Sequence, residues 1–137
     1  MRICGIEIKG SEAIIVIING TRASFEIIES RIKKMNLEND ELCEQVKKFK
    51  SDFESFIQTN LITKIFIKKR NKKGEFAGGP VSFKLEGLIQ LVQNCEVILV
   101  SPISIASVIK KMSVCVPNSL NKYQANAFET AFYGLED

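Results

Sequence analysis

The sequence contains no histidine, and none of its apolar runs is long. The absence of histidine excludes histidine-based catalytic triads and histidine-ligated zinc sites. The longest apolar run, residues 13–18, has six residues, whereas a membrane-spanning helix needs about 20. Met1 leads directly into a strand-like segment with no signal-peptide pattern. We therefore expect a cytoplasmic protein that does not associate with a membrane.

Closely spaced cysteine pairs are also missing. The four cysteines stand at positions 4, 43, 95 and 115, so no two of them form a Cys-x-x-Cys motif. This spacing argues against a zinc ribbon and against a thioredoxin-like redox site. Cys4 and Cys95 lie in or beside apolar runs, where cysteine usually behaves as a small hydrophobic residue. We expect reduced, buried thiols.

The composition is that of an ordinary globular protein. Charged residues make up 26% of the 137 residues and apolar residues 45%, which excludes a disordered, collagenous or coiled-coil chain. A chain of this length matches one typical domain of roughly 100–150 residues. We therefore expect a single domain that covers residues 1–137.

The first third of the chain has the pattern of three antiparallel strands. Residues 2–9 are short and β-branched, and residues 3–8 are apolar on both faces, which predicts a central strand. Residues 13–18 are almost entirely Ile and Val, as in a strand buried on both faces. Asn19-Gly20 is a strong hairpin signal. Residues 23–33 alternate loosely between apolar and charged side chains, and we expect them to form the third strand of the meander.

Helices alternate with strands in the rest of the chain. Asn39 or Asp40 is the expected N-cap of the first helix. The helix itself is expected because the apolar residues that follow are spaced by three and four. These apolar residues are Leu42, Val46, Phe49, Phe53, Phe56 and Ile57. Further strands are expected at residues 62–67 and 96–100. Helices are expected from Pro80, from Ser101 to residue 110 or 111, and at about residues 120–135.

The predicted order of elements is β-β-β-α-β-α-β-α-α. The fold class is therefore α/β, with a five-stranded mixed sheet, its first three strands antiparallel, and helices on both faces. This order is similar to that of the ribonuclease H-like fold.

Four short motifs make the resemblance more specific. The segment Gly5 to Ser11 resembles the first strand and turn of RuvC-type Holliday-junction resolvases, with Glu7 at the position of a metal-binding Asp. The segment at residues 126–129, Asn-Ala-Phe-Glu, stands at the position of the resolvase Asp-x-x-Asp. The segments at residues 82–87 and 100–111 resemble two further resolvase helices.

The chain looks closer still to a small bacterial family of unknown function. The resemblance rests on Cys4 to Ala13 and on Phe76 to Gly79, and it extends over nearly the whole chain. It implies the fold and brings no established activity.

The resolvase resemblance implies a two-metal nuclease site. Such sites hold two Mg²⁺ or Mn²⁺ ions with three or four converging carboxylates. Glu7 and Glu129 would be the catalytic carboxylates, and the metal ligands would be Glu7, Asn126 and Glu129. Asn126 replaces an acid with a neutral amide, and the position of the remaining Glu falls near Lys68 or Lys69.

The sequence therefore departs from the resolvase pattern at two of four positions, and the question of enzymatic activity stays open. A lysine ammonium in the place of a metal ion would pair with Glu7 and Glu129. Alternatively, Glu86 or Glu75 would substitute as a ligand and preserve metal-dependent catalysis. In every case, we expect Glu7, Glu129 and a lysine to meet at one end of the sheet.

A basic run follows the predicted strand at residues 62–67. It is a candidate surface for DNA or RNA, because clustered Lys and Arg side chains release counterions from a phosphate backbone. Its basic residues are Lys68, Lys69, Arg70, Lys72 and Lys73. The glycine-rich residues 74–79 lack the spacing of a phosphate-binding loop, and the net charge of the chain is only +3.

Two functions follow from these observations. The first is a nucleic-acid-associated protein of ribonuclease H-like fold with a degenerate metal-nuclease site. The second is a non-catalytic module that binds a protein partner, a pseudo-enzyme of which an immunity-type inhibitor is one form. Lys68 and Asn126, which break the carboxylate pattern, favour the second function.

Overall fold

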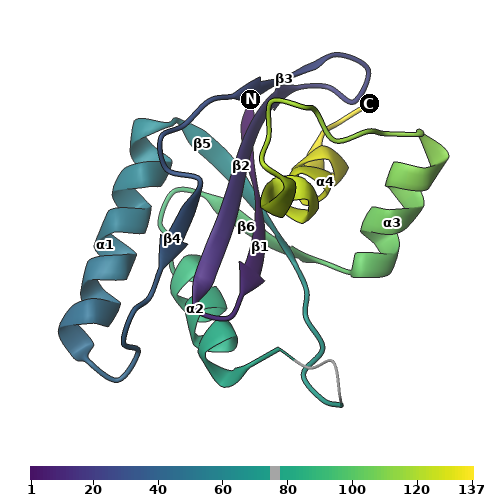
Figure 1. Cartoon of the computed structure of the whole chain (residues 1–137). Helices are drawn as coiled ribbons and strands as arrows, with labels where there is room; N and C mark the ends of the chain where they lie inside the picture. Colours follow the sequence, from purple (N-terminus) through teal and green to yellow (C-terminus); the bar gives the residue numbers. More distant parts are fainter. Residues whose placement is uncertain (75–77) are drawn as a thin grey trace.

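A six-stranded mixed sheet forms the centre of the computed structural model, which describes residues 1–74 and 78–137 (Figure 1). Its strands are β1 (Arg2–Lys9), β2 (Glu12–Gly20), β3 (Phe25–Ile28), β4 (Lys34–Asn36), β5 (Ile62–Lys68) and β6 (Glu96–Val100). The strand order is β3-β2-β1-β5-β6, and β4 pairs with β2 beside β3. The first strands are antiparallel, whereas β1, β5 and β6 run parallel.

The helices lie on both faces of this sheet. They are α1 (Cys43–Thr59), α2 (Pro80–Gln90), α3 (Pro102–Lys111) and α4 (Ala125–Gly134), and a short 3₁₀ turn, η1 (Lys122–Gln124), precedes α4. In Figure 1, α1 and α2 lie on one side of the strands, and α3 and α4 lie on the other. No helix of the described residues is long and apolar enough to cross a membrane.

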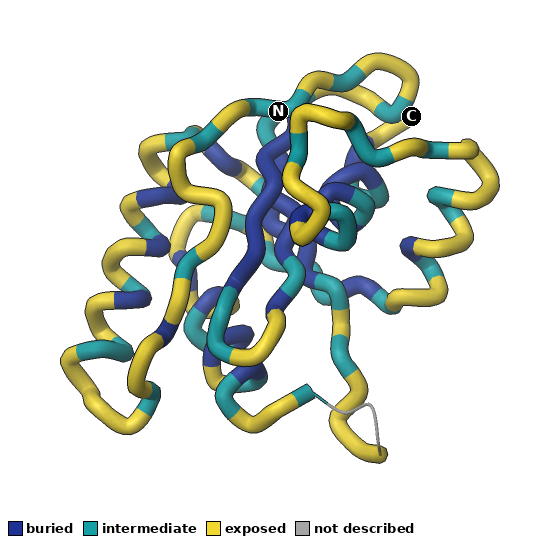
Figure 2. Tube along the Cα trace, viewed as in Figure 1, coloured by how far each residue is buried: buried dark blue, intermediate teal, exposed yellow. Residues whose placement is uncertain are grey.

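The alternating side chains of β1 and β2 divide the interior into two cores. Cys4, Ile6 and Ile8 of β1 face α1 and α2, while Ile3 faces α3 and α4. The central strand β1 lies between β2 and β5, and helices cover both of its faces, so its apolar residues are buried on both sides. Buried residues accordingly concentrate on the central strands, and exposed residues lie on the outer helix surfaces and loops (Figure 2).

The sheet has one strand more than the five that the sequence predicts. Residues 23–33 do not form one continuous strand, because the chain leaves the sheet after Ile28 and returns at Lys34. The two pieces, β3 and β4, both pair antiparallel with β2. Inside the gap, only one backbone hydrogen bond is retained, from the Ile15 N–H to the Lys33 carbonyl, at 2.9 Å.

Two predicted helix ends differ from the structure. The first helix begins at Cys43, and Leu42 is its N-cap residue, not Asn39 or Asp40. The Asn39 side chain instead accepts a hydrogen bond from the Glu41 N–H at 3.0 Å, which stabilises a turn before the helix. The last helix starts later than residue 120, since η1 fills its first turn. Ser101 caps α3 as predicted, and its side chain accepts a hydrogen bond from the Ile103 N–H.

The cysteines are only partly buried, in contrast to the prediction. All four are free; Cys4 is buried and Cys95 is half-buried, while Cys43 and Cys115 are exposed. Burial raises the pKa of the Cys95 thiol to about 11 and that of Cys4 still further. These two thiols therefore stay protonated and inert at neutral pH.

The close approach of α4 to β1 requires a glycine on the strand. A Cβ atom at Gly5 would lie 2.3 Å from the Ala127 carbonyl oxygen and 2.4 Å from the Ala131 backbone nitrogen. Ala127 and Ala131 are both completely buried against the strand. The three small residues therefore let the helix backbone rest directly on the sheet.

We predict that Gly5→Ala lowers the free energy of unfolding by about 2–3 kcal/mol, because the added methyl group forces α4 away from β1. Chemical denaturation measures this loss. Gly87→Ala in α2 is the matched control, since a Cβ there meets nothing within 4 Å. This control should be neutral or stabilising by about 0.5–1 kcal/mol. Equal effects of the two substitutions would contradict the packing argument.

Candidate functional site

A polar cluster lies at the carboxyl ends of β1 and β5, on the face of the sheet that α4 covers. The Asn126 Nδ2 donates a hydrogen bond to the Glu7 Oε2 at 2.8 Å. The Lys68 Nζ donates a hydrogen bond to the Asn126 Oδ1 at 3.3 Å. A carboxylate only accepts and an ammonium only donates, so the amide of Asn126 has one orientation that satisfies both partners. We call Glu7, Lys68 and Asn126 the polar triad.

The strand register sets Glu7 next to Lys68. In the parallel pair of β1 and β5, Ile6 lies opposite Ile67, so the following residues, Glu7 and Lys68, lie side by side at the strand ends. Both side chains are on the α4 face, because they follow Gly5 and Phe66 by two residues. Because adjacent strands are about 4.8 Å apart, the single amide of Asn126 can reach both side chains from above the sheet.

The start of α4 is held in place by side-chain hydrogen bonds. Asn121 and Gln124 form a capping box around η1. The buried Gln124 Nε2 also donates to the Ile15 carbonyl of β2 at 3.1 Å, across the gap between β3 and β4. Thr130 Oγ1 donates to the Asn126 carbonyl at 2.8 Å. These contacts fix the position of Asn126 over the strand ends.

Glu129 lies on the same side of α4 as Asn126. Asn126, Glu129 and Tyr133 are spaced by three and four residues, so they share one side of the helix. This side faces β5, because Asn126 contacts Lys68 and the Tyr133 ring packs edge-on against Phe66, with the ring centroids 6.4 Å apart. Glu129, which is half-buried, therefore lies on the side of α4 that faces β5.

The prediction that a lysine pairs directly with Glu7 or Glu129 is wrong. Within the described residues, no ion pair of 4.0 Å or less joins Lys68 or Lys69 to Glu7 or Glu129. The Asn126 amide instead separates Lys68 from Glu7 and hydrogen-bonds to both. The side chain that the sequence marks as a neutral replacement for an acid is thus the bridge of the polar triad.

The donor set does not fit a two-metal centre. No group of three or more His, Cys, Asp or Glu side chains in residues 1–74 and 78–137 is arranged to hold a metal ion. The alternative ligand Glu86 is engaged in an ion pair with Arg70. The other alternative, Glu75, lies outside the described residues. Two carboxylates and one amide supply too little negative charge for two divalent ions, and Lys68 adds a positive charge beside them.

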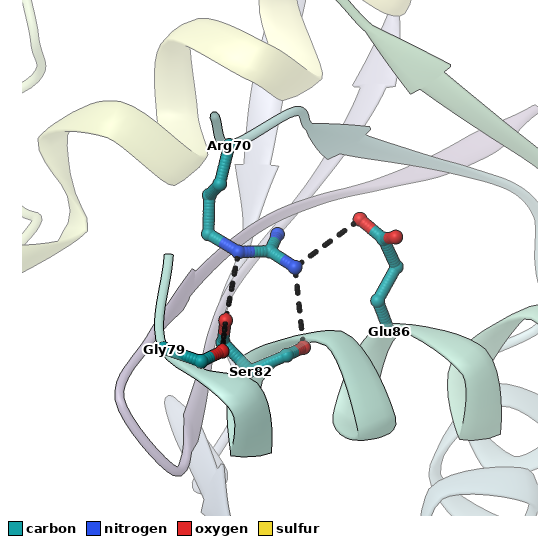
Figure 3. Close-up of polar contacts among 4 residues, drawn as sticks. All are labelled: Arg70, Gly79, Ser82 and Glu86. Atoms are coloured by element: carbon teal, nitrogen blue, oxygen red, sulfur yellow. Dashed lines mark hydrogen bonds and ion pairs between the residues drawn. The ribbon is translucent and has the colours of Figure 1, made fainter. Parts of the chain in front are cut away.

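A second polar cluster joins the basic run to α2. The Arg70 Nη2 lies 3.3 Å from the Glu86 Oε1, and these side chains are only 13% and 12% exposed. Arg70 also donates to the side-chain and backbone oxygens of Ser82, at 3.2 and 3.1 Å (Figure 3). Its guanidinium lies over the Phe83 ring. The Ser82 hydroxyl in turn donates to the Gly79 carbonyl.

This cluster was not predicted from the sequence, which placed Arg70 with the surface lysines. The available signal was Glu86, a charged residue between the buried Leu85 and Ile89 on the apolar side of α2. A buried carboxylate needs a cationic partner, and Arg70 is the arginine in the loop before that helix.

The five basic residues therefore fall into two groups. Lys69, Lys72 and Lys73 are exposed, and we call them the exposed lysines. Lys68 and Arg70 point inward, to Asn126 and to α2 respectively. Gly78 and Asn71 close the base of the loop with a hydrogen bond from the Gly78 N–H to the Asn71 carbonyl at 2.8 Å. The loop leaves the sheet directly beside the polar triad.

The order and pairing of these elements define a ribonuclease H-like fold. The structure of RuvC from Thermus thermophilus in complex with a Holliday junction substrate is similar, with a TM-score of 0.69 over 97% of this chain and 92% of that chain, at 10% identity. A fowlpox virus resolvase in complex with Holliday junction DNA has a TM-score of 0.57 over 96% and 94%, at 18% identity. At these identities the similarity concerns the fold alone.

The chain belongs to the family described as "Protein of unknown function (DUF3010)", whose model matches residues 1–134. No curated protein sequence matches the chain significantly. The expected resemblance to a family of unknown function with a resolvase-like fold is thus confirmed.

We predict that Glu86→Gln destabilises the protein by about 2–3 kcal/mol, because it leaves the shielded Arg70 guanidinium without a counter-charge. Thermal or chemical denaturation measures the loss. Arg70→Met combined with Glu86→Leu should recover part of the stability, since no buried charge is then left alone.

The matched control for this pair is Asp52→Asn, which breaks the solvent-exposed Lys48–Asp52 pair on α1. It should have a much smaller effect, because water screens exposed ion pairs. A loss as large as that of Glu86→Gln would show that burial of the Arg70–Glu86 pair is unimportant.

Proposed function

We propose that this protein binds nucleic acid through the exposed lysines and that its nuclease centre is degenerate, without metal-dependent cleavage. The observation that carries the proposal is the position of the basic loop. It leaves β5 at the carboxyl edge of the parallel strands, beside the polar triad, and the Arg70–Glu86 pair holds its base against α2. In open α/β sheets, this edge is where ligands usually bind.

The anchoring of the loop favours a binding surface over a freely moving basic segment. Arg70 contributes its charge to the interior, so three exposed ammonium groups remain at Lys69, Lys72 and Lys73. Ammonium groups beside an anchored loop base lose less conformational freedom when they contact phosphates. The fold resemblance to proteins crystallised with Holliday junctions supports a DNA ligand.

The composition of the polar triad supports the absence of cleavage. Hydrolysis of a phosphodiester by two metal ions requires carboxylates that hold the ions about 4 Å apart. Here Asn126 stands between Glu7 and Lys68, and it already uses both ends of its amide.

The binding part of the proposal predicts a salt-dependent interaction with branched, duplex or single-stranded DNA. Each phosphate contact contributes about 0.7–0.9 units to the slope of log affinity against log salt concentration. Replacement of Lys69, Lys72 and Lys73 by Ala should therefore reduce that slope by roughly two units. Fluorescence anisotropy at several salt concentrations measures it.

The matched control replaces three lysines elsewhere, Lys47, Lys111 and Lys122, which are also exposed. The net charge then changes equally, and the slope should fall less. The same slope for both triple variants would mean that the basic loop has no special role. Wild-type protein that binds no nucleic acid even at low salt would instead favour the alternative, a module that binds a protein partner.

The catalytic part predicts no cleavage of branched, duplex or single-stranded DNA or of RNA–DNA hybrids in Mg²⁺ or Mn²⁺. Wild type and Glu7→Gln should be equally inactive, because the site lacks the carboxylates that hold two ions. A metal-dependent resolvase serves as the positive control. Cleavage by wild type that disappears in Glu7→Gln would restore the nuclease interpretation.

A further inference from the structure

The position of Lys68 indicates that this residue does more than stand where the resolvase pattern has an acidic metal ligand. Glu7 comes from the end of β1 and Glu129 from the side of α4 that carries Asn126, and both are half-buried. Two carboxylates in such a place repel one another unless a cation lies close by. Lys68 is on β5, the strand that lies next to β1 and under the Glu129 side of α4.

The side chains around Lys68 hold its ammonium group in the site. Lys68 Nζ donates to Asn126 Oδ1, and the same amide donates to Glu7, so the positive and negative ends of the polar triad polarise the amide in the same direction. Asn126 itself is fixed by the packing of α4 on Gly5 and by Thr130. The ammonium therefore cannot leave without breaking this chain of hydrogen bonds.

We infer that Lys68 is a built-in cation that occupies the place of a divalent ion and excludes such ions from the site. An ammonium on a neighbouring strand is always present, whereas a metal ion must first lose part of its water shell and then compete for the same oxygens. The site thus keeps the charge balance of a metal centre without a metal.

A carboxylate in place of the Lys68 ammonium removes the competing charge and adds a third acidic ligand beside Glu7 and Glu129. Oxygen ligands are those that Mn²⁺ and Mg²⁺ prefer, and the affinity of a site rises with the number of its carboxylates. A single substitution should therefore convert the polar triad into a metal site.

The inference rests on the degenerate centre of the proposed function and is independent of nucleic-acid binding, because the test contains no nucleic acid. Titration calorimetry compares Mn²⁺ binding by wild type and Lys68→Glu. We expect Lys68→Glu to bind Mn²⁺ on the order of tenfold more tightly than wild type, or better, since it gains a carboxylate and loses a cation. Addition of Glu7→Gln to Lys68→Glu should abolish the gain and locate it at this site.

Lys47→Glu is the matched control. It makes the same change of net charge at an exposed position of α1, on the opposite face of the sheet, and should bind Mn²⁺ as wild type does. If Lys68→Glu does not fold, Lys68→Gln provides the measurement, because it removes the cation without adding a negative charge. It should still bind Mn²⁺ more tightly than wild type.

Two results would overturn the inference. The first is tight binding of Mn²⁺ by wild-type protein that Glu7→Gln abolishes, because Lys68 would then not exclude the ion. The second is a lack of any gain over Lys47→Glu in the folded Lys68 variants. Neither result bears on the salt dependence of DNA binding, so the inference and the binding part of the proposed function fail separately.

Discussion

The direct contact between α4 and β1 is the constraint on which the rest of the site depends. A helix backbone can rest on a strand only where the facing residues are small, and here Gly5 meets Ala127 and Ala131. This contact brings the first turn of α4 to the end of β1, where Asn126 reaches Glu7. A bulkier residue at Gly5 would displace the helix and separate the two side chains.

The two polar clusters have different physical roles at the same edge of the sheet. In the polar triad, Asn126 of α4 links the half-buried Glu7 carboxylate to the Lys68 ammonium. The Arg70–Glu86 pair lies against α2 and fixes the base of the basic loop. Arg suits the second role because its planar guanidinium bonds to Ser82 and Glu86 while stacking on Phe83.

Local patterns were sufficient for much of the fold. The order of strands and helices, the central position of β1 and the Ser101 cap follow from hydrophobic periodicity and capping chemistry, which act over a few residues. The break between β3 and β4 was missed because local patterns do not show that Gln124, about 100 residues further along the chain, donates to the buried Ile15 carbonyl at this gap. The start of α1 was misplaced because Asn39 stabilises a separate turn.

By itself, the sequence determined the ribonuclease H-like arrangement of elements and the candidate residues Glu7, Asn126, Glu129 and the basic run. Only the tertiary structure decided which of these side chains contact one another and which hydrogen bonds and ion pairs they form. Asn126 became the bridge between Glu7 and Lys68, and Arg70 turned inward while its neighbouring lysines stayed exposed. The reason is physical, because a hydrogen bond or ion pair requires a few ångströms of proximity between strands and helices that lie far apart in the chain.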